Sequence, residues 1–209
     1  MKCAEFYSWI DKIKPLINPY MSEKWERKST RKGYPFDFKE YDEGSWDLPE
    51  LEYIAYLRHH GFPTPILDWS QSPYVALFFA CEDFISTKTN GKVFVYIDEK
   101  NYSVDGNEIP FMRRVGYYVE AGKRHLAQKS EYLLPSKYYN YEWHFISVDE
   151  VITYDPKRYS IKEIEIDKRS KKLIISELHT MLVNRHNLYF DEDNLIKHFA
   201  DEFAIETIK

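Results

Sequence analysis

The chain has 209 residues, enough for one domain with its own hydrophobic core, and its 29 basic and 34 acidic residues give a net charge of −5. This balance disfavours a general nucleic-acid coat protein, which normally carries a basic excess. Two cysteines are too few for a disulfide framework, no apolar stretch approaches the roughly 20 residues of a membrane span, and the N-terminus lacks the apolar core of a signal peptide, so we expect a cytoplasmic protein with no membrane partner.

Two helices are predicted in the first third of the chain. Apolar residues recur at helical spacing between residues 4 and 18, and Pro15 is expected to kink or end this helix. Residues 21–47 are polar and irregular. Asp47 is a good N-cap for a second helix, and Gly61 is well placed to stop it.

The centre of the chain is predicted to be a buried strand followed by a helix. Residues 66–69 form a short apolar run, and Ser72-Pro73 combines an N-cap with a proline at the first helical position. The helix of about residues 73–85 is apolar nearly all round, which indicates a central position. A buried, inert thiol is therefore expected at Cys81.

The remainder of the chain is predicted to hold strands and then helices. Residues 92–97 have the clearest strand pattern, and residues 99–112 resemble a loop. Further short strands are predicted near residues 115–120, 130–134, 143–147 and 160–166. Two C-terminal helices are predicted near residues 170–185 and 191–204. Asp191 is a suitable N-cap for the second of them.

This order of elements indicates an α+β fold, with a mixed, mostly antiparallel β-sheet and flanking helices. No repeat, linker or low-complexity tract marks a boundary, so we expect a single domain over residues 1–209. Within it, residues 1–47 would hold the N-terminal helix and the irregular segment. Residues 48–166 would form the strand-rich core, and residues 167–209 the C-terminal helices.

Residues 66–80 form the first candidate site, because a strand, a turn and a helix N-terminus follow one another there. Free N–H groups and the positive end of the helix dipole favour a phosphate or a carboxylate at such a place. Asp68 and Ser70 add polar groups, and Trp69 adds a flat apolar wall. The alternative is structural: Asp68 caps backbone N–H groups, Trp69 is core and Ser70 is a turn residue. The sequence alone leaves both interpretations open.

Three basic side chains, Arg58, His59 and His60, end the preceding helix. A cation is favourable at a helix C-terminus for electrostatic reasons alone, so a charged cap is the simpler interpretation. Because the chain returns within a few residues, the same side chains are also placed to overhang Ser70.

A second polar cluster covers residues 123–135. Within it Glu131 opens an apolar strand, and Gln128 and Ser130 are close in sequence. A carboxylate at a strand start beside a cleft can bind a ribose hydroxyl or stabilise a positive charge. The plain alternative is an exposed glutamate at a strand edge.

Residues 58–70, followed by residues 73–80, resemble the core signature of the FRG domain family. That signature runs roughly Gln-His-Tyr-Gly-x-Pro-Thr-Arg-Leu-Leu-Asp-Trp-Thr and then Pro-x-x-Ala-Leu-x-Phe-Ala. Residues 124–132 are similar to the family's Arg-x-x-x-Gln-x-Gly-x-Phe segment, and residues 187–195 to its C-terminal Leu-Phe-Pro-Asp-Leu-Asp-Gly-Leu stretch. The resemblance therefore covers about residues 48–200.

Two departures from the family pattern bear on activity. Pro65 replaces the usual arginine of the core signature. The Phe-Arg-Gly motif that names the family is expected on an early strand, and residues 31–34 are a poor counterpart of it. If the early arginine holds a ligand in the family, the activity of this chain is in question.

The layout of the family is similar to the ADP-ribosyltransferase fold. Enzymes of that fold use an early Arg or His, a middle strand that ends in Ser or Thr before a helix rich in Ala and Phe, and a late strand opened by Glu. The resemblance implies an NAD-dependent ADP-ribosyltransferase of the toxin–antitoxin or phage-defence type, with Glu131, Ser70 and His60 as catalytic residues. The implied cofactor-binding residues are Arg58, His59, Asp68, Trp69, Tyr74 and Gln128.

In this interpretation NAD is the substrate, and its bond between ribose and nicotinamide breaks through an oxocarbenium-like transition state that Glu131 stabilises. No metal is expected, because the histidines lack HExxH spacing and the cysteines form no zinc pattern. The acceptor, nucleic acid or protein, is left open, as is a cognate antitoxin. The alternatives are a catalytically inactive FRG-type module that binds a nucleotide or a nucleic acid, and a metal-dependent hydrolase that uses Asp68 and Glu131.

Overall fold

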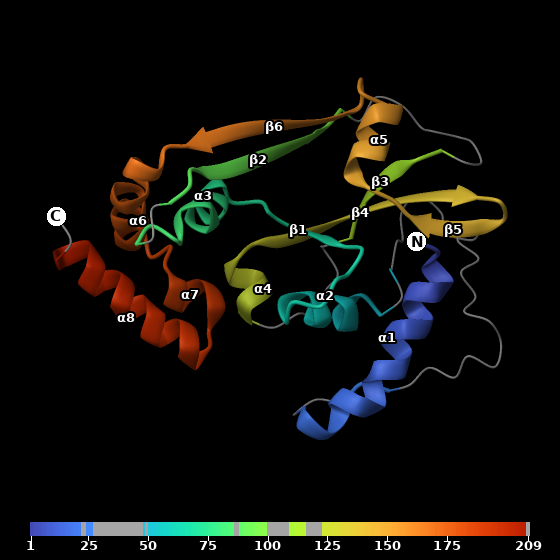
Figure 1. The fold of residues 1–209 in the computed structure, drawn as a ribbon, viewed down its shortest axis with the longest axis horizontal. Coiled ribbons are helices and arrows are strands. Elements are labelled where there is room, and N and C mark those ends of the chain that lie inside the picture. Colours follow the sequence, from blue (N-terminus) through green and yellow to red (C-terminus); the bar gives the residue numbers. More distant parts are fainter. Residues whose placement is uncertain are drawn as a thin grey trace. The chain divides into compact units, whose positions relative to one another are not determined.

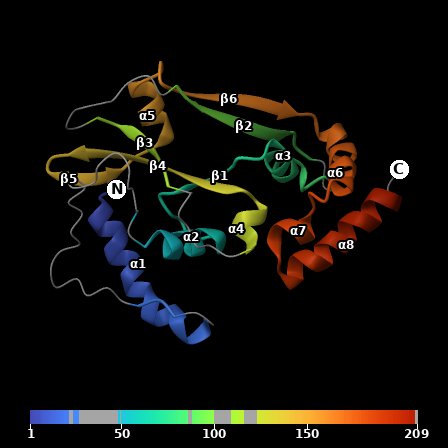
Figure 2. The same ribbon diagram turned by 180° about the vertical axis from the view of Figure 1, so that it is seen from behind.

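The computed structural model describes residues 1–21, 24–26, 48, 50–85, 88–99, 109–115 and 123–207. The chain forms two compact units, each built from three separate stretches. The first unit consists of Met1–Leu67, Lys100–Val119 and Leu133–Pro156, and the second of Asp68–Glu99, Glu120–Tyr132 and Lys157–Lys209. Figures 1 and 2 show the helices and strands from two opposite sides.

Helices and strands are interspersed along the chain, with two α-helices before the first strand and three after the last. The α-helices are α1 (Cys3–Ile17), α2 (Leu51–His59), α3 (Pro73–Cys81), α4 (Lys123–Ala127), α5 (Val148–Tyr154), α6 (Lys171–Thr180), α7 (Arg185–Tyr189) and α8 (Glu192–Thr207). The strands are β1 (Leu67–Ser70), β2 (Gly91–Asp98), β3 (Phe111–Arg114), β4 (Ser130–Tyr139), β5 (Glu142–Phe145) and β6 (Tyr159–Ile166). Short 3-10 helices, η1 (Asn18–Tyr20) and η3 (Lys168–Ser170), complete the described elements. Over the described residues, no helix combines the length and the apolar character that a membrane crossing requires.

The first unit packs α1 against antiparallel strands. β3 pairs with β4 so that Phe111 lies opposite Ser136, and β4 pairs with β5 so that Ser136 lies opposite Phe145. Phe6 of α1 packs edge-on against Phe145, with ring centroids 5.6 Å apart. The apolar face predicted for the first helix is therefore turned toward β5.

A buried cluster of charges joins α1 to the start of α2 in the same unit. The Nζ of Lys14 lies 3.1 Å from a carboxylate oxygen of Asp11 and 2.7 Å from one of Glu50. All three side chains are at most 4% exposed. Lys14 also donates to the Glu26 carbonyl oxygen at 3.0 Å. A buried ammonium is tolerated here because carboxylate and carbonyl oxygens surround it.

The second unit contains a two-stranded ribbon and the helices α3, α4, α6, α7 and α8. β2 and β6 pair antiparallel from Gly91 opposite Ile166 to Asp98 opposite Tyr159, and Figure 1 shows them side by side. The apolar core of this unit lies between α3 and the C-terminal helices and consists of Val75, Phe78, Cys81, Phe84, Ile175, Leu178, Leu188 and Ala204. Cys81 is fully buried and burial raises its pKa, so the expected buried thiol is confirmed.

Gly91 allows the ribbon to approach the end of α3 closely. A Cβ atom at this position would lie 2.2 Å from the carbonyl oxygen of Ala80, well inside van der Waals contact. Any side chain would therefore push β2 away from α3, and only glycine permits the observed packing.

The α+β class and the antiparallel pairing predicted from the sequence are confirmed. β2 and β6 contain the strands predicted at residues 92–97 and 160–166. Residues 111–114 form β3, although a loop was predicted over residues 99–112. The strand predicted near residues 115–120 falls mostly outside the described part of the chain.

Helix boundaries differ more from the predictions. α1 continues through Pro15. α2 begins at Leu51 rather than directly after Asp47, a residue outside the described ranges. The helix predicted over residues 170–185 ends at Thr180 as α6, and α4 and α5 were not predicted. The expected caps of the central and last helices are confirmed, since Ser72 and Asp191 accept hydrogen bonds from backbone N–H groups in the first turns of α3 and α8.

We expect the substitution Lys14→Met to lower the free energy of unfolding by about 3–5 kcal/mol, because two carboxylates would remain buried without their counter-charge. Urea unfolding followed by circular dichroism measures the change. Lys2→Met is the matched control, since Lys2 also lies 2.7 Å from a glutamate, Glu142, but both side chains are 48% exposed. The control should change stability little. Equal effects of both substitutions would contradict a structural role for the buried cluster.

Candidate functional site

The start of α3 is built as the sequence predicted. The hydroxyl oxygen of Ser72 accepts a hydrogen bond from the Val75 N–H at 3.4 Å, and Pro73 follows the cap as the first helical residue. The Val75 N–H is used by this cap, and Pro73 has no N–H. An anion at this end of α3 would therefore be attracted mainly by the helix dipole and less by free N–H donors. The anion preference expected here therefore depends on the field of the helix.

Ser70 ties the turn ahead of α3 to the chain ahead of β4. Its hydroxyl donates to the carbonyl oxygen of Gln128 at 2.7 Å and accepts from the Ser72 N–H at 3.0 Å. The N–H of Gln71 donates to the carbonyl oxygen of Lys129 at 3.1 Å. The two stretches that the sequence assigned to one site are thus neighbours within the second unit. The hydroxyl of Ser70 is already used in holding them together.

Glu131 is the second residue of β4 and its side chain is half-buried. The turn before it is sharp, because Lys129 has a left-handed φ of 46°. This conformation is uncommon for a residue with a side chain, and it is found where the surrounding structure enforces it. The hydrogen bonds from Ser70 and Gln71 to the neighbouring carbonyl oxygens supply that enforcement. These hydrogen bonds fix the backbone directly ahead of β4 and therefore the position of Glu131.

Tyr132, next to Glu131, forms a buried polar pair with His125. The rings are stacked with centroids 5.7 Å apart, and the phenol oxygen lies 3.4 Å from Nδ1 of the imidazole. Burial, followed by the negative charge of Asp68, raises the pKa of Tyr132. The negative charge of the exposed Asp68 therefore lies close enough to the start of β4 to affect Tyr132. Sequence reasoning did not select His125 or Tyr132, because nothing in their spacing marks them.

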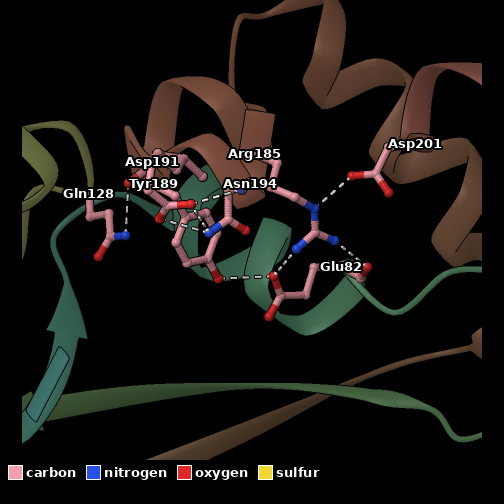
Figure 3. A network of polar contacts seen from close by, with 8 residues as sticks. Glu82, Gln128, Arg185, Tyr189, Asp191, Asn194 and Asp201 are labelled. Atoms are coloured by element: carbon pink, nitrogen blue, oxygen red, sulfur yellow. Dashed lines mark hydrogen bonds and ion pairs between the residues drawn. The ribbon is translucent and has the colours of Figure 1, made fainter. Parts of the chain in front are cut away.

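Gln128 anchors a C-terminal helix. Its buried side chain donates from Nε2 to the carbonyl oxygen of Leu188 in α7 at 2.9 Å, as Figure 3 shows. The backbone carbonyl of the same residue accepts from Ser70. Gln128 thus serves the fold through both its side chain and its backbone.

The neighbouring network fixes α7 and α8 to the end of α3. Arg185 donates to the carboxylate of Glu82 at 3.0 Å and to that of Asp201 at 2.9 Å, and the Tyr189 hydroxyl donates to Glu82 at 3.0 Å (Figure 3). The guanidinium of Arg124 lies 4.6 Å from the centroid of the Tyr189 ring. The buried Nε of Arg124 meets no hydrogen-bond acceptor among the described residues. Arg124 opens the segment that resembles the family but was not among the proposed site residues, and it lies in α4 directly ahead of Gln128.

The two aromatic candidates lie in different surroundings. Trp69 is half-buried against Tyr96 of β2, with ring centroids 5.8 Å apart, and Tyr96 stacks in turn on Tyr159. This packing favours the structural interpretation of Trp69. Tyr74, in the first turn of α3, is 53% exposed, which leaves much of its ring accessible to a ligand.

Arg58, His59 and His60 lie at the end of α2, in the first unit. His60 is exposed and its ring packs against Tyr56, with centroids 4.4 Å apart. Gly61 follows with a φ of 81° and donates its N–H to the Arg58 carbonyl oxygen, so the predicted helix stop is confirmed. The approach of these three side chains to Ser70 stays a prediction.

Comparison with known proteins supports one part of the sequence interpretation. Residues 9–89 match the FRG domain family, so the resemblance to this family is confirmed over that part of the chain. The matched range contains α1 from Trp9 onward together with α2, β1 and α3, whereas Gln128 and Glu131 lie beyond it. Neither a search of curated proteins nor a search of solved structures produced a match.

We expect Ser70→Ala to lower the free energy of unfolding by about 1–3 kcal/mol, because the Gln128 carbonyl oxygen and the Ser72 N–H would both lose a partner. Ser70→Thr keeps the hydroxyl and should lose less. Urea unfolding of the two variants and the parent protein tests this. If the alanine variant is as stable as the parent protein, the hydroxyl does not hold the turn against β4.

Proposed function

We propose that this protein, which carries the FRG domain match, is an NAD-dependent ADP-ribosyltransferase with an ADP-ribosyltransferase-like fold in which Glu131 stabilises the reacting ribose. The observation that carries the proposal is the hydrogen bond from Ser70 to Gln128, which brings the turn ahead of α3 next to the strand that Glu131 opens. This is the pairing of elements that the resemblance requires. The match over residues 9–89 adds support for the Ser70 side of the pair.

In the proposed reaction, the bond between the ribose C1′ and the nicotinamide nitrogen breaks and its electron pair leaves with nicotinamide. The ribose develops positive charge, which the carboxylate of Glu131 stabilises electrostatically. A nucleophilic group of the acceptor then attacks C1′ and releases its proton to solvent. No proton has to reach the leaving group, because the nicotinamide nitrogen of NAD is already cationic.

The surrounding residues have distinct roles in this proposal. Ser70 acts as a positioning residue, because its hydroxyl is used in holding the turn. Tyr74 supplies an exposed ring for stacking on a base or on nicotinamide. Arg124 and the dipole of α3 attract the diphosphate, which suits the Nε of Arg124 that no described acceptor meets. The acceptor is a nucleic acid or a protein, and a toxin or phage-defence role would imply a cognate antitoxin.

The second candidate is a catalytically inactive FRG-type module that binds a nucleotide or a nucleic acid. It is favoured by the engagement of Ser70, Gln128 and Trp69 in contacts within the fold. The substitution of Pro65 for the family's arginine points the same way.

We expect Glu131→Gln to slow the release of nicotinamide from NAD by at least about 10²-fold, because a neutral amide cannot stabilise the oxocarbenium-like charge. Release is measured with radiolabelled nicotinamide, in the presence of cell protein or total RNA as acceptor. Glu163→Gln is the matched control, since Glu163 is a strand glutamate of the same unit paired with Lys92 at 2.8 Å on the exposed ribbon. The control should leave the rate unchanged.

The same preparation separates the two candidates. An enzyme consumes NAD and labels an acceptor, and Glu131→Gln abolishes both effects. A binding module consumes no NAD and labels no acceptor, and the nucleotide or nucleic acid that it binds should stabilise it by about 2.7 kcal/mol at a hundredfold excess of ligand over the dissociation constant. Equal turnover by the parent protein and the Glu131 variant would contradict the proposed role of the carboxylate.

A further inference from the structure

Three side chains with metal-binding atoms converge between α6 and α8, in the second unit. They are His179, His198 and Glu202, and one ligand atom from each lies within 4.8 Å of the others. The candidate site described above uses none of them. A metal was not expected from the sequence, because these ligands come from two helices and form no linear motif.

The local geometry follows from the positions of the residues on their helices. His198 and Glu202 are four residues apart on α8 and therefore share one face, with Nε2 of the histidine 3.5 Å from a carboxylate oxygen. His179, from α6, packs its ring against that of His198, with centroids 5.3 Å apart. His186 of α7 also stacks on His198, with ring centroids 6.0 Å apart.

An ordinary ion pair along α8 does not account for this cluster. The Nε2 of His179 and the Nδ1 of His198 are buried, and neither has a hydrogen-bond partner within the described parts of the chain. A buried nitrogen without a partner is costly, and two such nitrogens in adjacent rings double that cost. A cation bound at Nε2 of His179 and at Nε2 of His198, the nitrogen that faces Glu202, would satisfy the first of these two nitrogens.

We propose that His179, His198 and Glu202 form a binding site for a divalent first-row transition metal ion of the zinc class, joining α6 to α8. Two imidazoles and a carboxylate are ligands that zinc accepts, at metal–ligand distances of about 2.0–2.2 Å. Such distances place neighbouring ligand atoms of a tetrahedron roughly 3.3 Å apart, close to the separation observed between His198 and Glu202. The ligand atom of His179 lies within 4.8 Å of the other two. The proposal is independent of the proposed NAD chemistry.

The test uses the full chain without an affinity tag, freed of metal with a chelator that is then removed. Zn²⁺ alone is titrated in competition with a chromophoric chelator, and thermal unfolding is followed with and without the ion. We expect one equivalent of Zn²⁺ to bind and to raise the melting temperature. Glu202→Gln and His198→Gln should each weaken binding by more than about tenfold, since even the loss of a ligand's supporting partner commonly costs 10–100-fold.

One control and one surface variant make the result specific. His144→Gln removes a histidine of β5, in the first unit, and should leave zinc binding unchanged. Glu202 has a side chain that is 49% exposed, so its glutamine variant tests the site even if the His198 variant folds poorly. Failure of the parent protein to bind zinc stoichiometrically, or unchanged affinity in the Glu202 variant, would overturn the proposal.

Discussion

The hydroxyl of Ser70 is the point on which the arrangement of the second unit depends. It closes the turn into α3 through the Ser72 N–H and ties that turn to the Gln128 carbonyl, directly ahead of β4. Gln128 then extends the connection to α7 through Leu188. The side chains of Ser70 and Gln128 together link a strand end, a helix start and a C-terminal helix that are far apart in sequence. Because the hydroxyl has one proton to donate, its strong bond to a carbonyl oxygen leaves it an acceptor for any further partner.

This use of Ser70 constrains how the chemistry can work. A serine that holds the fold cannot donate its proton to a substrate without releasing the turn, so its contribution to any reaction is positional. In the proposed function the charges would then be supplied by the carboxylates of Glu131 and Asp68 and by the guanidinium of Arg124. His125 and Tyr132 form a buried pair at the start of β4, and burial raises the pKa of the phenol, so Tyr132 stays neutral.

The sequence correctly predicted those helix ends that depend on interactions between residues close together in the chain. Ser72-Pro73 begins α3 because a hydroxyl and a ring satisfy the first turn without help from elsewhere. The predicted start of α2 was wrong because Glu50 forms an ion pair with the buried Lys14 of α1. This contact joins residues far apart in the chain, so a local sequence pattern does not reveal it. Ser147 and Glu150 carry a capping signal for α5 that was missed, since the neighbouring residues favour a strand. That Ser70 and Glu131 lie close together was predicted only from the family resemblance. No pattern in the sequence predicted the cluster of His179, His198 and Glu202.

The two proposals meet in α3, which is held at both ends. Its start is fixed by Ser72 and by the Ser70 turn, and its end is fixed by Glu82, to which Arg185 and Tyr189 donate. Asp201 of α8 holds Arg185 in this position, and it lies one helical turn from His198 and directly before Glu202. A metal ion that joins α6 to α8 would therefore restrain the residue that secures Arg185 against α3. Its removal would loosen the end of α3 that Glu82 fixes and would lower the stability of the second unit.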